Sequence, residues 1–404
     1  MNRATPILAA AAIVFGAAAP AWGQERGPEP AQVAAAIDRG MRFLKGDGVQ
    51  VNPQVRPTKG GAGSNELKLL TFIHGGLPEN DPVFQELLTR STQTELLKTY
   101  NVSLLAVALE ELNRVTHQQK IWQCAQFLID NMAPNGEWGY GEPTTYVEPA
   151  TTPSAPRRST ATSAAPKPKQ AGRVVDFDAP DPARRTKPLV TRWLPVKKQR
   201  EGINPHDNSN TQYAALGLRA SHDAGIVLPK DVIERAMKWW RDTQLDASRG
   251  AGGGKGAPVA TEGGASPAGW SYTDTGRPYG SMTVGGVGSL AIYHYILGQD
   301  WKKDPAVQKG VEWIARNFSV TENPQKPEAY YFYYLYGLER AGVLYGTETF
   351  GTHPWYAEGA RELLRAQKQD GSWGEGVTDT CFAILFLRRA TSPLVASVDS
   401  ARKK

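Results

Sequence analysis

A dense polar cluster lies at residues 206–212, which read His-Asp-Asn-Ser-Asn-Thr-Gln. Imidazole and carboxyl groups transfer protons near neutral pH, so His206 and Asp207 are candidate catalytic residues. In a concave site the neighbouring groups would bind a polar ligand such as a sugar. The alternative is structural, because Asp, Asn and Ser are preferred at helix amino termini. The candidate binding residues of this cluster are Asn208, Asn210, Gln212 and Tyr213.

An aromatic band follows at residues 330–336, where five tyrosines and one phenylalanine occupy seven positions. Facing a cavity, such rings stack on a sugar, hold an isoprenoid or stabilise a cation; elsewhere they pack the core. Because a helix displays residues on every side, we expect about two of the six to face a cavity. Glu339 and Arg340 come next, and we interpret them as an ion pair to a neighbouring helix. The further candidate ligand contacts are Ser281, Thr283, Glu328, Tyr330, Tyr331 and Tyr334.

Metal-ligating residues are sparse along the chain. Asp379 and Cys381 form an Asp-x-Cys arrangement, and carboxylate and thiolate groups are zinc ligands. No histidine follows them, since the last one is His353. The alternative is that Asp379 caps a helix and Cys381 is a small buried residue. The sequence therefore predicts no metal and no cofactor. If a metal were bound, Asp379 and Cys381 would be its candidate ligands.

The elements that position these residues are helices of two alternating kinds. One kind is amphipathic, as where Val307, Val311 and Ile314 follow i, i+4, i+7. The other kind is apolar all round, as at 381–387, and must be covered on every side. Six pairs stack and close on themselves, which predicts an all-α fold, an α/α toroid of six hairpins. The outer helices begin near residues 31, 81, 117, 229, 304 and 354, and the inner ones near 64, 100, 207, 280, 328 and 378.

Two inserts interrupt the helical pattern. Residues 141–203 are rich in Pro, Ser, Thr and basic residues, and we expect them to be disordered. Residues 246–269 are Gly-rich and predict a flexible loop. Twelve basic and three acidic residues between Arg157 and Arg200 give +9, which leaves −3 for the rest of a total of +6. The insert is thus a candidate for contact with an anionic envelope polymer or lipid, and no nucleic acid partner is expected.

The amino terminus has the pattern of a secretory signal peptide over residues 1–23. Arg3 is followed by an apolar run at 7–19, and Ala21 and Gly23 are the small residues of a cleavage site. We therefore expect a secreted or periplasmic protein in which residues 24–404 form one toroid domain. Cys124 and Cys381 allow at most one disulfide, and the sequence leaves open whether they pair.

A turn with a repeated pattern follows several outer helices. Residues 367–373 read Gln-Lys-Gln-Asp-Gly-Ser-Trp, and residues 135–139 read Asn-Gly-Glu-Trp-Gly, with Met132 at the position of the Gln. Gln244 and Gly269-Trp270 form a third copy that the Gly-rich loop divides. We expect the Gly to allow the turn, the Gln amide to cap the helix end and the Trp to pack over the turn.

This turn resembles the QW repeat of the terpenoid cyclase and protein prenyltransferase superfamily. The chain looks most like secreted bacterial proteins with prenyltransferase/squalene-oxidase repeats, over most of residues 30–392. The other segments that carry the resemblance are 208–213, 334–340 and 379–382. The resemblance implies the α/α toroid and says little about activity, because the repeats are structural.

The catalytic motifs of this superfamily are missing. Squalene-type cyclases use an Asp-x-Asp-Asp acid, whereas this chain has no Asp-Asp pair and Asp176-Phe177-Asp178 lies in the basic insert. Protein prenyltransferases bind zinc through Asp-x-Cys and a later His, which Asp379 and Cys381 lack. We therefore expect a protein that binds a hydrophobic or glycan ligand, or a partner, in its central cavity. The alternatives are an extracytoplasmic enzyme that acts on an isoprenoid lipid or glycan through the cavity rim, and zinc-dependent prenyl transfer.

Overall fold

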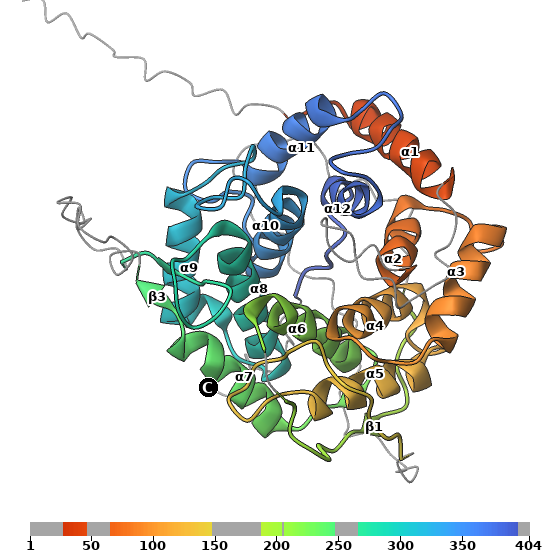
Figure 1. Cartoon of the computed structure of the whole chain (residues 1–404), viewed down its shortest axis with the longest axis vertical. Coiled ribbons are helices and arrows are strands. Elements are labelled where there is room, and N and C mark those ends of the chain that lie inside the picture. The colour runs from red at the N-terminus through yellow and green to blue at the C-terminus, as the bar shows by residue number, and fades with distance from the viewer. Residues whose placement is uncertain (1–26, 47–64, 148–186, 204–205, 247–265, 395–404) are drawn as a thin grey trace, which may run out of the picture.

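The computed structural model describes residues 27–46, 65–147, 187–203, 206–246 and 266–394. Within these ranges the α-helices form two concentric rings (Figure 1). The chain is an all-α protein with the fold of an α/α toroid, as the sequence predicts. The outer ring holds α1 (Pro30–Gly46), α3 (Pro82–Gln93), α5 (Gln118–Asp130), α7 (Lys230–Asp242), α9 (Pro305–Arg316) and α11 (Trp355–Ala366). The inner ring holds α2 (Asn65–Gly75), α4 (Thr99–Asn113), α6 (Asn208–Asp223), α8 (Gly280–Ile296), α10 (Tyr331–Tyr345) and α12 (Val377–Leu387).

The ring is closed. Along the inner ring each helix packs against the next, and α12 returns to pack against α2. The outer helix α1 likewise contacts α11 and α12. The first and last hairpins therefore lie side by side, as the red and blue ends of the ribbon show in Figure 1.

The two kinds of helix differ in how much of their surface is buried. The outer helix α9 buries one face, and Asp304 and Pro305 begin it as expected: the Asp304 carboxylate accepts a hydrogen bond from the Ala306 backbone N–H (2.8 Å). The inner helix α8 buries every position from Gly280 to His294. Burial on all sides explains why the inner sequences lack a polar face.

The tryptophan of each repeated turn fastens an outer helix to the inner helix that follows it. The Trp373 indole N–H donates to the Leu363 carbonyl in the last turn of α11 (2.7 Å), and its backbone N–H donates to the Thr380 hydroxyl on α12 (2.9 Å). Gly371 turns the chain at a φ of +89°, which favours glycine. The same pair of bonds recurs at Trp138, to Leu128 and Thr211, and at Trp270, to Trp240 and Thr283.

The glutamine of the repeated turn does not cap its own helix, which corrects the expectation from the sequence. The Gln367 amide instead donates to the Ala36 carbonyl on α1 (2.8 Å), and the Gln244 amide donates to the Ala306 carbonyl on α9 (2.8 Å). Each amide thus joins two neighbouring outer helices. At Gln367 this bond closes the outer ring.

The turn after α5 has Met132 instead of glutamine, and residues 187–203 supply its donors. The Lys198 ammonium donates to the carbonyls of Ile129 and Met132 (both 2.7 Å), which the end of α5 leaves free. Nearby, β1 (Leu194–Pro195) pairs in parallel with β2 (Ile226–Val227). The expectation of disorder over 141–203 is therefore wrong for the flanks at 141–147 and 187–203. The Pro-rich remainder, 148–186, lies outside the described residues.

Two other expectations concern segments beyond the described ranges. The signal peptide at 1–23 lies outside them, and so do residues 247–265 of the Gly-rich loop. The ends of that loop are held where β3 (Leu245–Asp246) pairs antiparallel with β4 (Ala268–Gly269). A short 3₁₀-helix, η2 (Trp301–Lys303), precedes α9.

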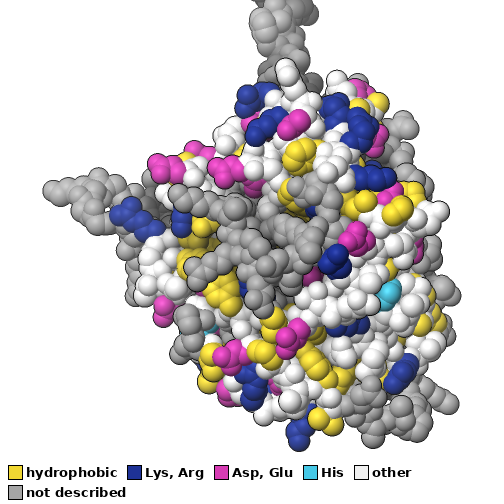
Figure 2. All heavy atoms as spheres, turned by 45° about the vertical axis from the view of Figure 1, so that its right-hand side comes forward, with side chains coloured by type: hydrophobic (Ala, Val, Ile, Leu, Met, Phe, Trp, Pro, Cys, Tyr) yellow, Lys and Arg dark blue, Asp and Glu magenta, His cyan; other side chains and the backbone are white. Residues whose placement is uncertain are grey.

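Among the described helices none is long and apolar enough to cross a membrane. On the face shown in Figure 2, acidic and basic side chains are intermingled.

Candidate functional site

The polar cluster at residues 206–212 lies where α6 begins, and most of it serves the helix. The Asp207 carboxylate accepts hydrogen bonds from the Asn210 backbone N–H (2.7 Å) and the Asn210 amide (2.9 Å). The Asn208 side chain accepts from the Trp239 indole (2.9 Å) and donates to the Ser271 carbonyl (2.9 Å). The structural alternative therefore accounts for Asp207, Asn208 and Asn210.

His206 has a partner that the sequence did not indicate. Its Nδ1 contacts the Glu137 carboxylate, which comes from the repeated turn after α5 and also accepts from the Asn135 amide (2.8 Å). Burial raises the pKa of Glu137 to about 8 and lowers the pKa of His206. Burial also raises the pKa of Asp207, whose carboxyl interacts with the Tyr272 hydroxyl. This rim thus holds a buried carboxyl behind a partly exposed imidazole.

The equivalent positions on the other inner helices also serve structure. The Ser281 backbone N–H donates to the Asn323 side chain (2.9 Å), whose amide donates to the Ser281 hydroxyl (3.2 Å). The Thr283 hydroxyl accepts from the Trp270 backbone, as described above. Glu328 is exposed in the loop before α10. These three candidates do not come together in one site.

The aromatic band places other tyrosines in the ring than the ones selected from the sequence. Tyr331 and Tyr334 donate to the carbonyls of Val320 (2.6 Å) and Ser319 (3.0 Å) in the loop after α9, so they do not face the centre. Tyr330 is 56% exposed. Tyr333 and Tyr336 lie in the centre instead, and the helical period puts Arg340 on the same face.

The centre of the ring is filled by a hydrogen-bonded aromatic cluster. The Tyr333 hydroxyl bonds to the Ser209 hydroxyl (2.7 Å) and accepts from the Gln212 amide (2.7 Å). Its ring stacks on Tyr213, with the two centroids 6.0 Å apart and the planes 9° from parallel. The Tyr100 hydroxyl reaches Ser209 from α4. Of the predicted binding residues, Gln212 and Tyr213 therefore do meet in the ring centre.

A cavity of about 40 Å³ lies inside the inner ring, toward the carboxyl ends of its helices. Its walls come from α2, α4, α6 and α10, and residues 390–392 cover one side. Part of the wall is apolar, from Leu70, Leu104, Val107 and Leu216, and tyrosine rings add to it. The rest of the wall is charged. The cavity is on the opposite side of the ring from the predicted rim site.

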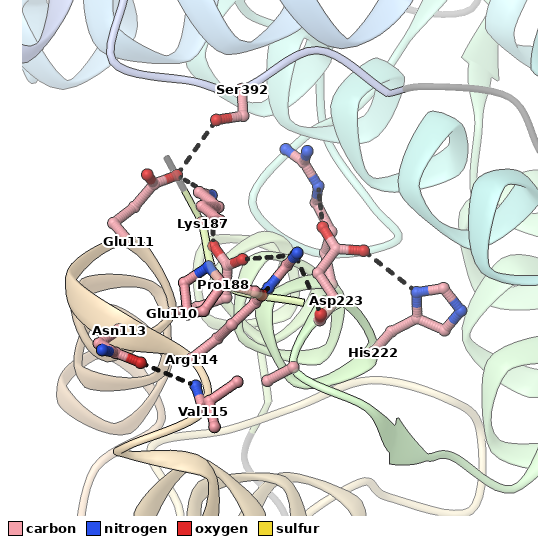
Figure 3. Close-up of polar contacts among 12 residues, drawn as sticks. Glu110, Glu111, Asn113, Arg114, Val115, Lys187, Pro188, His222, Asp223 and Ser392 are labelled. Atoms are coloured by element: carbon pink, nitrogen blue, oxygen red, sulfur yellow. Dashed lines mark hydrogen bonds and ion pairs between the residues drawn. The ribbon is translucent and has the colours of Figure 1, made fainter. Parts of the chain in front are cut away.

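A network of charged residues surrounds this cavity (Figure 3). The Lys187 ammonium donates to the carboxylates of Glu110 (2.6 Å) and Glu111 (2.7 Å), and the Ser392 hydroxyl donates to Glu111 (3.2 Å). Farther along, Asp223 is paired with Arg219 (3.3 Å). Lys187 belongs to the basic segment expected to be disordered, and here it is fixed between two carboxylates.

The two adjacent glutamates of α4 differ in proton affinity. Burial raises the pKa of Glu110 to about 7. Burial acts in the same direction on Glu111, but the charges of His74 and Lys187 outweigh it and lower the pKa of Glu111. At neutral pH, Glu110 is therefore partly protonated and Glu111 is ionised.

Glu339 and Arg340 do not form the expected ion pair to a neighbouring helix. The Glu339 carboxylate accepts from the Thr391 backbone N–H (3.0 Å) and hydroxyl (2.7 Å), and burial raises its pKa to about 7. Arg340 donates to the Gln212 side chain (3.0 Å), and its guanidinium carbon lies 4.2 Å from the centroid of the Tyr336 ring. Both residues are buried, and the prediction fails because each is engaged by an uncharged partner.

Asp379 and Cys381 do not form a metal site with other described residues. The Asp379 carboxylate accepts from the Glu375 backbone N–H (2.8 Å) at the start of α12, and Cys381 is buried. In the part of the chain that the structure describes, no group of three His, Cys, Asp or Glu side chains is arranged to hold a metal ion. Cys124 and Cys381 are both buried, and no disulfide joins them to each other.

Glu110, Glu111 and Arg219 were not selected from the sequence, and Arg340 was interpreted only as a member of an ion pair. Glu110 and Glu111 end an otherwise apolar run from Leu104 to Leu109, and Arg340 follows the tyrosine band. A charged residue on an all-round apolar helix must be buried, and that signal was present in the sequence. Lys187 carried no such signal.

Comparisons with known proteins give distant structural matches only. No protein-family model matches the chain, and no curated protein is significantly similar to it. The structure is similar to a point variant of the type II terpene cyclase MstE from Scytonema in complex with its substrate geranylgeranyl dihydroxybenzoate, at 12% identity and a TM-score of 0.48, over 89% of this chain and 97% of that one. The apo form of MstE matches at 12% identity and a TM-score of 0.32, over 90% and 99%. Another MstE variant with the same substrate matches at 12% identity and a TM-score of 0.29, over 89% and 97%. Identity this low does not transfer an activity to this chain.

Proposed function

We propose that this toroid binds a small ligand with polar and apolar parts in the cavity at the carboxyl ends of its inner helices. The observation that carries the proposal is the cavity itself, which combines leucine side chains with Glu110, Arg219 and Arg340. Such a mixed wall of apolar surface and a few polar groups is the usual lining of a ligand site.

The size of the cavity limits the ligand. Sites for drug-sized ligands span roughly 300–1,000 Å³, whereas this cavity measures about 40 Å³. The space beside it is occupied by the cluster of Tyr213, Tyr333 and Arg340. A long isoprenoid or an oligosaccharide would have to displace that cluster, so we favour a ligand of a few heavy atoms.

The test is to fill the cavity and ask whether binding stops. Ligand-observed NMR would screen the intact chain against short carboxylates, amides, alcohols and monosaccharides. We expect at least one class to bind to the wild type and none to bind to Leu216→Trp. Leu88→Trp, on an outer helix away from the cavity, is the matched control and should bind as the wild type does. If the wild type binds no class, or Leu216→Trp binds equally well, the proposal is wrong.

A second candidate function is acid–base catalysis on a glycan or lipid at the rim. The observation that favours it is the pairing of His206 with the buried Glu137, because a carboxyl group behind an imidazole fixes its tautomer and orientation. Tyr140 and Tyr272 are exposed beside it (57% and 41%) and offer ring faces to a sugar.

The rim candidate has its own test. Purified chain would be incubated with soluble neutral and acidic polysaccharides, and newly formed reducing ends would be measured. His206→Gln should abolish any turnover with the melting temperature unchanged. Asp207 is unsuitable for this test because it caps α6. Turnover that survives His206→Gln would exclude this site.

Two further inferences concern where the protein is located and which anionic partner its basic segment binds. We infer secretion or a periplasmic location from the signal-peptide pattern of residues 1–23, and fractionation of cells that express the full chain tests it. We also infer salt-sensitive binding of the basic segment to anionic vesicles. Deleting 148–186 should abolish that binding, and the ordered flank at 187–203 should keep the ring folded.

A further inference from the structure

Arg340 is a buried cation without a carboxylate partner. The residue is 4% exposed, and among the described residues it forms no ion pair. Its Nη2 donates to the Gln212 side chain (3.0 Å), and its Nη1 has no hydrogen-bond partner. A buried guanidinium group normally has its donors paired, because leaving a charged donor unpaired is unfavourable.

The carboxylates nearest in the fold are committed to other groups. Glu339, the adjacent residue, accepts both of its hydrogen bonds from Thr391. Glu111 is held by Lys187, and Asp223 is held by Arg219. None of these three carboxylates neutralises Arg340 by direct contact. Within the described ranges Arg340 thus has no counterion in direct contact, and a bound anion would supply one.

Arg340 also lies in the wall of the cavity, together with a second unpartnered group. Ser103 lines the same cavity from α4, and its hydroxyl too lacks a hydrogen-bond partner. The rings of Tyr336 and Tyr213 cover the guanidinium, at 4.2 and 5.4 Å from their centroids. Because these rings cover the faces of the guanidinium group, its unpaired N–H donors can form a hydrogen bond only in the plane of the group.

We propose that Arg340 and Ser103 form a subsite for the carboxylate of a small aliphatic monocarboxylic acid, and this rests on the proposed function of the cavity. A carboxylate matches the planar fork of a guanidinium and accepts a hydroxyl proton as well. The apolar tail of the acid then lies against Leu104, Val107 and Leu216. These contacts would give hydrogen-bond partners to Arg340 Nη1 and the Ser103 hydroxyl, and would place the tail of the acid against the apolar part of the wall.

The charges of the cavity favour a monoanion over a dianion. The nearby cations Lys187 and Arg219 are already paired with Glu110, Glu111 and Asp223, which leaves the single charge of Arg340 to balance one negative charge on the ligand. Inorganic phosphate is partly dianionic at neutral pH. The subsite should therefore discriminate a carboxylate both from phosphate and from an uncharged molecule of the same shape.

The experiment compares matched probes on the intact chain. Isothermal titration calorimetry and thermal shift would measure acetate, propionate and butyrate, with propionamide as the uncharged isostere and inorganic phosphate as the dianion. We expect propionamide and phosphate to bind at least tenfold more weakly than propionate. Arg340→Met should weaken propionate at least tenfold and leave propionamide unchanged. Arg365→Met, at an exposed position on α11, is the matched control and should bind as the wild type does.

Ser103→Ala keeps the test decisive if Arg340→Met does not fold. That variant removes one hydroxyl from the cavity wall and should weaken propionate about tenfold, the loss of a single hydrogen bond to a charged carboxylate. Equal binding of propionate and propionamide, tighter binding of phosphate, or unchanged propionate binding in Ser103→Ala and Arg340→Met would each overturn the subsite. The cavity proposal would survive those outcomes, because Leu216→Trp would still block whichever probe binds. If none of these probes binds to the wild type, the subsite is wrong, and the proposed function is wrong only if the wider screen of amides, alcohols and monosaccharides finds no ligand either.

Discussion

The two ends of the inner helices use polar residues for different purposes. At the amino ends, Asp207 and Thr283 satisfy backbone donors and hold the tryptophan turns. At the carboxyl ends, the charged side chains of Glu110, Lys187 and Arg340 are not needed to satisfy the free backbone groups of the helix ends. Arg340 retains an unpaired donor. A dense polar cluster therefore does not mark a site by itself, and neither does one buried atom without a partner, because Asn210 Oδ1 at the amino end is such an atom too. What distinguishes the carboxyl ends is a buried charged donor without a partner in the wall of a cavity.

Trp373→Ala should have the largest effect of any single change at the amino ends. The indole is fully buried and makes one of the two hydrogen bonds that tie α11 to α12, so the free energy of unfolding should fall by about 3–5 kcal/mol. Urea denaturation measures it. Trp301→Ala, at a partly buried tryptophan, is the control and should cost less. Equal losses at both positions would remove the special role of the turn tryptophan.

Glu339→Gln should have the next largest effect, and it should depend on pH. Burial raises the pKa of Glu339 from 4.5 to about 7 in the folded chain. The native state then holds a proton that the unfolded chain releases, so wild-type stability falls as pH rises from about 4.5 to 7 and is level above that. The variant avoids this loss, which amounts to about 3 kcal/mol at most.

The measurement for Glu339 is urea denaturation of wild type and variant at pH 5 and pH 8. The difference in free energy of unfolding between them should shift in favour of the variant at pH 8. Glu312→Gln, on the exposed face of α9, is the control and should show no such shift. A difference that is the same at both pH values would mean that Glu339 is not held protonated in the folded ring.

Asp207→Ala should have a smaller effect, confined to stability. Loss of the cap on α6 should lower the free energy of unfolding by about 1 kcal/mol. Binding of propionate in the cavity should not change, because Asp207 lies at the other end of the helix. Calorimetry on the folded variant measures this. A loss of binding would contradict the division of the inner helices into a structural end and a binding end.

Glu110→Gln should have the smallest effect, on the pH dependence of ligand binding. As pH rises through about 7 the Glu110 carboxyl ionises, and its negative charge opposes a bound carboxylate. Propionate should bind a few fold more weakly to the wild type at pH 8 than at pH 6, and equally at both to the variant. If the affinity of the variant for propionate falls between pH 6 and pH 8 as much as that of the wild type, the pH dependence arises from another group. The other charged groups near the cavity remain in the variant: His74, Glu111, Arg114, Lys187, Arg219, Asp223 and Arg340.

The fold could be predicted almost completely because its signals are local and repeated. The Asp-Pro caps at residues 81 and 304, the alternation of amphipathic and apolar helices, and the Gly-Trp turns each report on neighbouring residues. The role of Gln367 could not be predicted in the same way. Its amide bonds to Ala36, and nothing near residue 367 in the sequence identifies that partner.

The site was harder to predict for the same reason. The predicted ligand contacts Gln212 and Tyr213 lie in the ring centre, whereas Tyr330, Tyr331 and Tyr334 do not. The sequence of a wholly apolar helix does not show which of its faces points to the centre. The cavity depends on side chains from four helices and on residues 390–392. Only the assembled ring brings Ser103 and Arg340 into the wall of one cavity.

The bond from Gln367 to Ala36 has a consequence for the order in which the chain folds. Donor and acceptor are 331 residues apart, so α1 has no partner for this contact until nearly the whole chain has been made. Contacts of such separation form late and slow the folding of a domain. The apolar face of α1, with Ile37 and Leu44, therefore remains exposed to solvent while the later hairpins fold. Exposed apolar surface of this kind makes the incomplete ring prone to aggregation and a binding site for chaperones.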